Sequence, residues 1–133
     1  MPRPLPRFPE HDSEPFWKAT AEHRLTYQTC DDCATVVFYP RQHCPSCGSP
    51  NVSWRDSSGL GAVYTFSVVR QNRSSAFRDL VPYVVAWIDL DEGFRLMSNV
   101  VDTNPNDVKV GMRVRVQWED HDGLALPLFA PAE

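Results

Sequence analysis

Residues 30–47 read CDDCATVVFYPRQHCPSC and contain two Cys-x-x-Cys pairs with ten residues between them. Two residues between cysteines allow both sulfurs to turn inward, so two such knuckles on facing hairpins place four thiolates tetrahedrally around one ion. Gly48 directly follows the second pair and lets the backbone turn where a side chain would clash. Because all four ligands are cysteines, the site is closed to water and substrate, which indicates a structural role. We therefore predict a structural zinc site formed by Cys30, Cys33, Cys44 and Cys47.

The cysteine pattern leaves some alternatives to zinc open. Iron in a rubredoxin-type site would use the same ligands, although Ala34 stands where that class usually has glycine. His43 could replace a cysteine as ligand, but a solvent-facing position beside the knuckle suits it better. Two disulfides are disfavoured, because four cysteines in a chain without a secretion signal indicate metal. Metal binding would also supply the folding free energy that so small a ribbon lacks.

The chain beyond the cysteines has the pattern of a small β-barrel. Residues 57–61 form a turn cluster, at which we place the boundary between two modules. A long loop separates the first two of five β-rich runs, and the turn Asp91-Glu92-Gly93 joins the second to the third. Residues 104–108 can form one helical turn before the fourth run. This layout is typical of an OB-fold, although the strand count also fits other barrel topologies. The runs are 62–69, 83–90, 94–101, 113–119 and 124–130.

The segment before the cysteines predicts an extended arm and a short helix. Prolines in residues 1–11 disfavour helix, so this arm is either an unstructured tail or lies on a partner. Asp12 and Ser13 are possible caps for a helix that contains Phe16 and Trp17. Alternation from residue 24 predicts a strand that leads into the first cysteine. We thus expect a mainly β chain with an arm and short helix (1–23), a zinc ribbon (24–58) and a five-stranded OB-fold barrel (59–133).

No segment resembles an export signal or a membrane span. The proline-rich residues 1–15 contain no continuous apolar stretch, and the longest apolar run, 83–88, is far too short to cross a bilayer. We therefore expect a cytoplasmic protein that does not bind membranes.

We find no motif for an independent active site. Gly59-Leu60-Gly61 does not match the dinucleotide fingerprint, because Tyr64 stands at the third glycine position and a strand follows. The four histidines lie in polar segments without neighbours that suggest a catalytic pair. Asp89, Asp91 and Glu92 are interpreted as a solvated turn. A site assembled from scattered residues stays open, as does the question whether the chain is an enzyme.

The loop at residues 70–81 has the composition of a binding loop. It carries Arg70, Arg73 and Arg78 around the apolar residue Phe77. Arginines can hold phosphates, and an aromatic ring can cover an adenine or a pantetheine arm. Loops on a rigid barrel are frequent binding sites, although a solvated loop without a ligand fits the sequence equally well. We predict that these four residues bind a CoA thioester or a partner protein, and the sequence leaves open which.

Taken in order, several segments resemble the DUF35 family, in which an N-terminal rubredoxin-like zinc ribbon is joined to an OB-fold. The resemblance covers about residues 16–131, and the combination is specific although no single motif is. Ala34 departs from it, since many relatives have glycine there. The segments are Phe16-Trp17, the strand entering Cys30, residues 43–49 (HCPSCGS), residues 59–66 (GLGAVYTF), residues 82–86 (PYVVA), residues 90–93 (LDEG) and residues 110–114 (VGMRV).

This resemblance implies a non-catalytic accessory or scaffold subunit. Members of the family bind thiolase-fold enzymes that act on acyl-CoA, either thiolases or lipid-transfer-protein-like aldolases, some of them lyases of steroid side-chain degradation. The catalytic groups then reside in the partner. We expect a hetero-oligomer, a heterotetramer, in which this chain stabilises the enzyme, helps to bind CoA, and contacts the partner through Phe16 and Trp17. The acyl group, the choice between aldolase and thiolase, and the stoichiometry stay open.

A nucleic-acid-binding module is the main alternative, since zinc ribbons and OB-folds both occur in that role. The chain carries 13 Lys and Arg against 17 Asp and Glu, for a net charge of −4. Binding to phosphate backbones is mostly electrostatic and calls for the opposite balance. We therefore expect no nucleic-acid partner.

Overall fold

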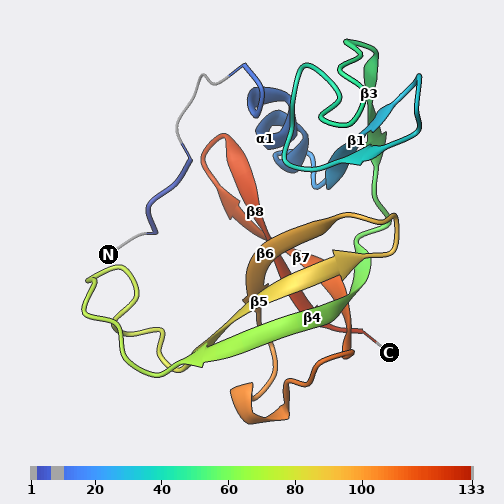
Figure 1. The fold of residues 1–133 in the computed structure, drawn as a ribbon. Helices are drawn as coiled ribbons and strands as arrows, with labels where there is room; N and C mark the ends of the chain where they lie inside the picture. The colour runs from blue at the N-terminus through green and yellow to red at the C-terminus, as the bar shows by residue number, and fades with distance from the viewer. Residues whose placement is uncertain (1–2, 7–10, 133) are drawn as a thin grey trace.

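The computed structural model describes residues 3–6 and 11–132, which form a short helix, a three-stranded ribbon and a closed five-stranded barrel (Figure 1). This confirms the predicted mainly β fold; residues 1–2 and 7–10 of the predicted arm lie outside the described residues. The elements are α1 (Glu14–Thr20), β1 (Thr26–Cys30), β2 (Val36–Val37), β3 (Val52–Asp56), β4 (Leu60–Val69), β5 (Tyr83–Leu90), β6 (Arg95–Val100), the 3₁₀ turn η1 (Pro105–Asp107), β7 (Arg113–His121) and β8 (Leu124–Pro131).

The barrel closes in the order β4-β5-β6-β8-β7, and β7 returns to pair with β4. All neighbouring strands are antiparallel except β6 and β8, which meet in parallel at Val100 and Phe129. This is the OB-fold arrangement, with η1 between the third and fourth strands as predicted. The first barrel strand starts at residue 60, two residues earlier than expected, because Gly61 already pairs with β5. Glycine allows this close pairing, since a Cβ at position 61 would lie 2.5 Å from the Asp89 carbonyl oxygen. The fourth strand continues to His121.

Alternation along β5 shows how the sequence fills the barrel. Its residues alternate between half-buried and fully buried, and the buried set is Val84, Ala86, Ile88 and Leu90. Successive side chains of a strand point to opposite faces, so every second residue enters the core. Phe129 of β8 and Val114 of β7, both with no exposed surface, complete the barrel interior.

The ribbon is a three-stranded sheet with β1 in the middle, between β2 and β3. Two of the buried residues of β1 are polar: Thr26 and Gln28 are buried together with Cys30. Gln28 replaces lost water contacts by pairing with the Arg41 backbone: its amide donates to the carbonyl at 2.9 Å and accepts from the N–H at 2.8 Å. Tyr27, on the opposite side of β1, faces the barrel.

An aromatic junction joins the ribbon to the barrel. It consists of Phe16 from α1, Tyr27 from β1, Phe38 from the ribbon and Phe94 from the β5–β6 turn. The Phe38 and Tyr27 rings each stack on Phe94 with centroids 4.9 Å apart, and Phe16 meets Phe38 edge-on at 5.7 Å. Such pairs bury much area and also favour these geometries. The α1 helix and the ribbon therefore share one core with the barrel, as the common position above β5 and β6 in Figure 1 suggests.

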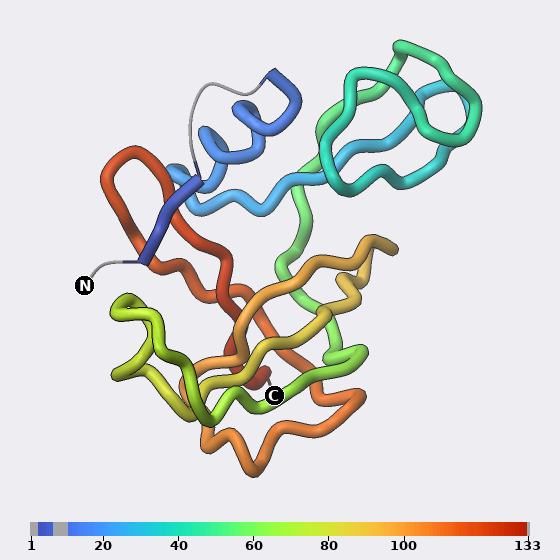
Figure 2. The backbone as a smooth tube through the Cα atoms, turned by 60° about the vertical axis from the view of Figure 1, so that its left-hand side comes forward, coloured from blue at the N-terminus to red at the C-terminus, as the bar shows by residue number. Residues whose placement is uncertain are grey.

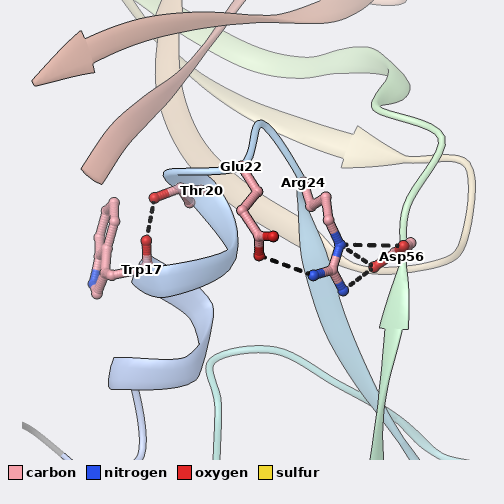
Figure 3. A network of polar contacts seen from close by, with 5 residues as sticks. All are labelled: Trp17, Thr20, Glu22, Arg24 and Asp56. Atoms are coloured by element: carbon pink, nitrogen blue, oxygen red, sulfur yellow. Dashed lines mark hydrogen bonds and ion pairs between the residues drawn. The ribbon is translucent and has the colours of Figure 1, made fainter. Parts of the chain in front are cut away.

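Polar contacts support this arrangement at the connections. Thr20, fully buried at the end of α1, donates to the Trp17 carbonyl at 2.6 Å and accepts from the Ala125 N–H of β8 at 3.2 Å. Figure 3 shows the neighbouring Arg24, whose guanidinium lies 3.3 Å from Glu22 and 3.0 Å from Asp56. These bonds attach the helix to β8 and the start of β1 to the end of β3.

The turn carboxylates Asp89, Asp91 and Glu92, interpreted from the sequence as solvated, are partly exposed and also make hydrogen bonds and ion pairs. Glu92 accepts from the Ser57 hydroxyl at 2.5 Å and from the Ser58 N–H at 2.9 Å, which connects the turn to the ribbon–barrel linker. Asp89 pairs with Arg95 and Asp91 with Arg113. Those arginines are 6 and 22 residues away in sequence, so the strand pairing was needed to find them. Among the described residues, no helix is long and apolar enough to cross a membrane.

Candidate metal centre and binding loop

The two Cys-x-x-Cys knuckles adopt the same backbone turn. In the first, the Ala34 N–H donates to the Cys30 carbonyl at 2.9 Å; in the second, the Gly48 N–H donates to the Cys44 carbonyl at 2.8 Å. The N–H of the leading cysteine also donates to the residue five positions later in both, at 2.9 Å and 2.8 Å. Matching turns on facing segments bring the four sulfurs together.

The four sulfurs fit a single tetrahedral metal ion. Cys30 and Cys47 Sγ lie 3.6 Å apart, Cys33 and Cys44 Sγ also 3.6 Å, and all four atoms lie within 4.8 Å of one another. A tetrahedron with Zn–S bonds of about 2.3 Å has S–S edges of about 3.8 Å. The four cysteines are free thiols, so the structure does not support the disulfide alternative. Zinc bound here would have four protein ligands and no open position.

The surroundings of the thiols favour their ionised form in part. Backbone N–H groups of Cys47 and Ser46 lower the pKa of the Cys44 thiol to about 6. The Thr35 hydroxyl, with its sulfur contact of 3.0 Å, lowers the pKa of Cys33. Thiolates are the metal-binding form, so these donors favour that form at Cys33 and Cys44.

The two aspartates between Cys30 and Cys33 hold the knuckle in place. Asp31 accepts from the Ser53 hydroxyl of β3 at 2.7 Å, and Asp32 accepts from the Ser49 hydroxyl and, at 3.1 Å, from the Asn51 amide. These bonds lower the pKa of Asp32, so it stays charged. Neither aspartate could be assigned a role from its local sequence, because the partners come from the second knuckle and from β3.

Ala34 adopts the backbone conformation that the second knuckle reserves for glycine. Its φ is +65°, and that of Gly48, at the equivalent position, is +78°. A side chain in this left-handed region clashes with the following carbonyl oxygen. The alanine at position 34, where many relatives have glycine, therefore adopts the same turn as the glycine of the second knuckle.

The predicted binding loop is folded. Residues 74–80 form consecutive turns, in which the Arg78 N–H donates to the Ser74 carbonyl at 2.8 Å. Asn72 begins these turns by accepting from the Ser74 N–H, while its amide donates to the Tyr83 hydroxyl at 2.9 Å. Phe77 is half-buried, with its ring 6.0 Å from that of Tyr83. The loop therefore presents a defined surface at the end of β4 and β5 (Figure 1).

The loop arginines lie on this surface and point to solvent. Arg70, Arg73 and Arg78 are all exposed, and Arg70 donates to the Asn106 side chain at 3.3 Å. Among the described residues, no carboxylate forms an ion pair with any of the three. Guanidinium groups that are free of carboxylates can contact an anion without first breaking a bond. Phe77 is less available than predicted, because the Arg3 guanidinium lies 5.8 Å from its ring centroid.

Phe16 and Trp17, predicted to contact a partner, have different surroundings. Phe16 is 6% exposed and belongs to the aromatic junction, whereas Trp17 is half-buried. Both line a cavity of about 540 Å³ between α1, the ribbon and strands β6 and β8, beside the exposed Tyr39 and Met97. Their role in partner binding stays a prediction, and Trp17 has the more accessible surface of the two.

Two histidines have carboxylate partners that the sequence did not indicate. His23 Nε2 lies 2.5 Å from Asp120 and His121 Nε2 lies 2.8 Å from Glu119, so two of the four histidines pair with carboxylates in the folded chain. The first pair joins residues 97 positions apart, which only the tertiary fold brings together. His23 stacks on Trp118, with the ring centroids 5.5 Å apart. Neither pair has a described serine, threonine or cysteine bonded to the imidazole, as nucleophilic catalysis would require.

Comparison with known families gives two adjacent matches. The family described as "ChsH2, rubredoxin-like zinc ribbon domain" matches residues 17–53, and "ChsH2, C-terminal OB-fold domain" matches residues 54–119. A DUF35 domain-containing scaffold protein of Methanocaldococcus jannaschii is 39% identical over 101 residues, which are 71% of each chain.

A longer relative and a solved structure match almost the whole chain. A probable enoyl-CoA hydratase alpha subunit of Thermomonospora curvata is 37% identical over 98% of this chain. The chain spans only 40% of the length of that relative. A solved structure, "Ltp2-ChsH2(DUF35) aldolase", contains a chain that is 35% identical, with a TM-score of 0.86 over 98% of this chain and 100% of that one.

Proposed function

The chain belongs to the DUF35 family of zinc-ribbon and OB-fold proteins, and we propose that it is an accessory, scaffold-type subunit of an enzyme that acts on acyl-CoA. The observation that carries this proposal is the likeness to the DUF35 chain of the Ltp2–ChsH2 aldolase, which extends over 98% of this chain and 100% of that chain. The shared fold, the matching length and the 35% identity are our reasons for expecting a similar partner-facing surface. The names of the archaeal relatives, which describe scaffold proteins, support the same role.

We further propose that the partner is a thiolase-fold enzyme of the lipid-transfer-protein-like type, and that it holds the catalytic groups. The reaction would be a retro-aldol cleavage or a thiolase reaction in lipid or steroid side-chain breakdown. Two relatives are named as hydratase alpha subunits, which favours an acyl-CoA intermediate as the substrate. Two copies of this chain on a dimer of the enzyme would give a heterotetramer.

In this complex the metal centre has a structural role. Zinc would be held by Cys30, Cys33, Cys44 and Cys47, and it would supply folding free energy to the ribbon. The ribbon in turn covers one side of the aromatic junction through Tyr27 and Phe38. The metal therefore supports the part of the chain that positions α1 and its Trp17 side chain beside the 540 Å³ cavity.

The binding loop is our candidate for contact with the CoA moiety. Its arginines Arg73 and Arg78 are exposed and free of described carboxylate partners, in a chain whose net charge is −4. The overall net charge of the chain is negative, so it does not account for several arginines in one loop, whereas an anionic ligand would. The phosphates of CoA match the bidentate donors of arginine.

Purification of the tagged chain from its native cells, followed by mass spectrometry, tests the accessory-subunit proposal. We expect an acyl-CoA enzyme in near-equal amount, and we expect that enzyme to lose solubility or activity when it is produced without this chain. An enzyme that is soluble and fully active alone would contradict the proposal. Recovery of nucleic acid would instead favour the alternative module, which the comparisons do not favour.

A double substitution, Arg73→Ala with Arg78→Ala, tests the role of the loop in the assembled complex. We expect the affinity for a CoA thioester, measured by calorimetry, to fall about tenfold or more, since two charge-assisted contacts to phosphate are lost. The control is Arg115→Ala, an exposed arginine on β7 outside the loop. Unchanged CoA affinity together with loss of the enzyme subunit would assign the loop to partner contact.

A further inference from the structure

Arg3 is held more firmly than its place near the chain terminus suggests. Its Nε lies 2.7 Å from Glu119 Oε1 and one terminal nitrogen lies 3.3 Å from Oε2, so both carboxylate oxygens are bound. The Arg3 side chain is only 20% exposed. By comparison, Arg24, Arg95 and Arg113 in the other described arginine–carboxylate pairs are 45–49% exposed. The arm is therefore anchored in a covered site, and Figure 2 shows it beside the β7–β8 hairpin.

The site around the Arg3 guanidinium is built from two parts of the barrel. Glu119 comes from β7 and also contacts His121 at 2.8 Å, while Phe77 of the binding loop presents its ring 5.8 Å from the Arg3 guanidinium carbon. Burial raises the pKa of Glu119, but the bonds from Arg3 and His121 outweigh burial and keep this pKa below its ordinary value. A charged carboxylate next to an aromatic ring is a suitable site for a guanidinium group.

Three cavities meet at the Arg3 side chain. Besides the cavity of about 540 Å³ beside α1, one of about 240 Å³ lies at the base of the binding loop and one of about 290 Å³ lies next to Trp118. The first and second share Asn99 as a wall, and the first and third share Leu128. The second and third share two walls, Val101 and Asp102. Arg3 is the one described residue that lines all three.

We propose that the Arg3 side chain of the amino-terminal arm occupies the junction of one continuous groove and divides this groove into three cavities. Release of the Arg3–Glu119 pair joins the cavities along the β6–β8 side of the barrel. The arm is thus an internal occupant that competes with any apolar ligand of the groove, whose walls include Trp17, Leu128 and Trp118. Because Arg3 also contacts Phe77, release of the arm uncovers the ring of the binding loop at the same time.

The four tryptophans allow a direct test by NMR, since each indole N–H gives a separate signal. Trp17 and Trp118 line cavities that contain Arg3, whereas Trp54 and Trp87 do not. In Arg3→Ala we expect the signals of Trp17 and Trp118 to shift while those of Trp54 and Trp87 stay in place. Arg115→Ala is the matched control and should leave all four unchanged. Superimposable spectra of Arg3→Ala and the unmodified chain would overturn the proposal.

A second measurement tests competition for the groove with the apolar dye anilinonaphthalene sulfonate. We expect Arg3→Ala to bind the dye roughly fivefold more tightly. This factor corresponds to the free energy of one partly buried ion pair, which the dye no longer has to break. The double variant Arg3→Glu with Glu119→Arg restores the ion pair with reversed charges but not the contacts with Phe77 and His121, so dye binding should return part of the way to its original level. Equal dye affinity in Arg3→Ala and the unmodified chain would show that the arm does not occupy a binding groove. A zinc content of one ion per chain confirms that each variant is folded.

Discussion

The two knuckles of the metal centre allow a paired substitution whose outcome follows from backbone geometry. Ala34 and Gly48 occupy equivalent positions with φ of +65° and +78°. An L-residue in this region costs roughly 1–2 kcal/mol, and a glycine costs about 0.4–1 kcal/mol through the entropy of the unfolded chain. A Cβ on Gly48 would meet no atom within 4 Å, so sterics against neighbours add nothing. We expect Ala34→Gly to stabilise the chain, and Gly48→Ala to destabilise it, each by about 0.5–1 kcal/mol.

Thermal unfolding at a fixed excess of zinc measures the effect. For a chain of 133 residues the expected change in melting temperature is about 2–4 °C, upward for Ala34→Gly and downward for Gly48→Ala. If the ribbon depends on zinc as proposed, zinc affinity in competition with a chromophoric chelator should change in the same direction, by about two- to fivefold. Gly111→Ala is the control. Gly111 has the same kind of backbone conformation, with a φ of +87° and no atom within 4 Å of a new Cβ, but it belongs to the barrel and not to the ribbon. It should lower the melting temperature with no change in zinc affinity. A lower melting temperature for Ala34→Gly would refute the reasoning.

Four further substitutions test the metal site, the buried polar contacts and the carboxylate of Glu92. Cys44→Ser should abolish stoichiometric zinc binding and broaden or shift the indole NMR signal of Trp54 in β3, because the ribbon loses a buried ligand. Thr20→Val should destabilise by about 1–3 kcal/mol in urea unfolding, because it leaves the buried Ala125 N–H without an acceptor. Thr26→Val is its control and should be neutral or stabilising, since that hydroxyl is buried and has no partner among the described residues. Glu92→Gln should remove an acid-sensitive part of the stability. Hydrogen bonds from the linker outweigh burial and lower the pKa of Glu92 in the folded chain, so its contribution is present above about pH 4–5 and is lost as the pH falls through the folded pKa. Equal slopes of stability against pH for both proteins would contradict this.

Those features of the fold and site that rest on local patterns could be read from the sequence. The spacing of the four cysteines is enough to predict a metal knuckle, because two intervening residues set the direction of both sulfurs. Alternation along residues 83–90 predicts β5, since every second side chain of a strand enters the core. The 105–107 turn and the long binding loop likewise follow from proline, asparagine and glycine positions.

Contacts between distant segments were decided only by the tertiary structure. Glu119 and Arg3 are 116 positions apart, and nothing in either local sequence marks them as partners. The same holds for Thr20 with Ala125, for His23 with Asp120, and for the walls of the groove. Barrel closure places β8 next to α1 and β7 next to the arm, and that closure depends on the pairing of whole strands. The sequence by itself therefore determined the cysteine pattern and the strands, because their signals are local; the packing of the strands decided which charges and cavities meet, because that depends on many residues at once.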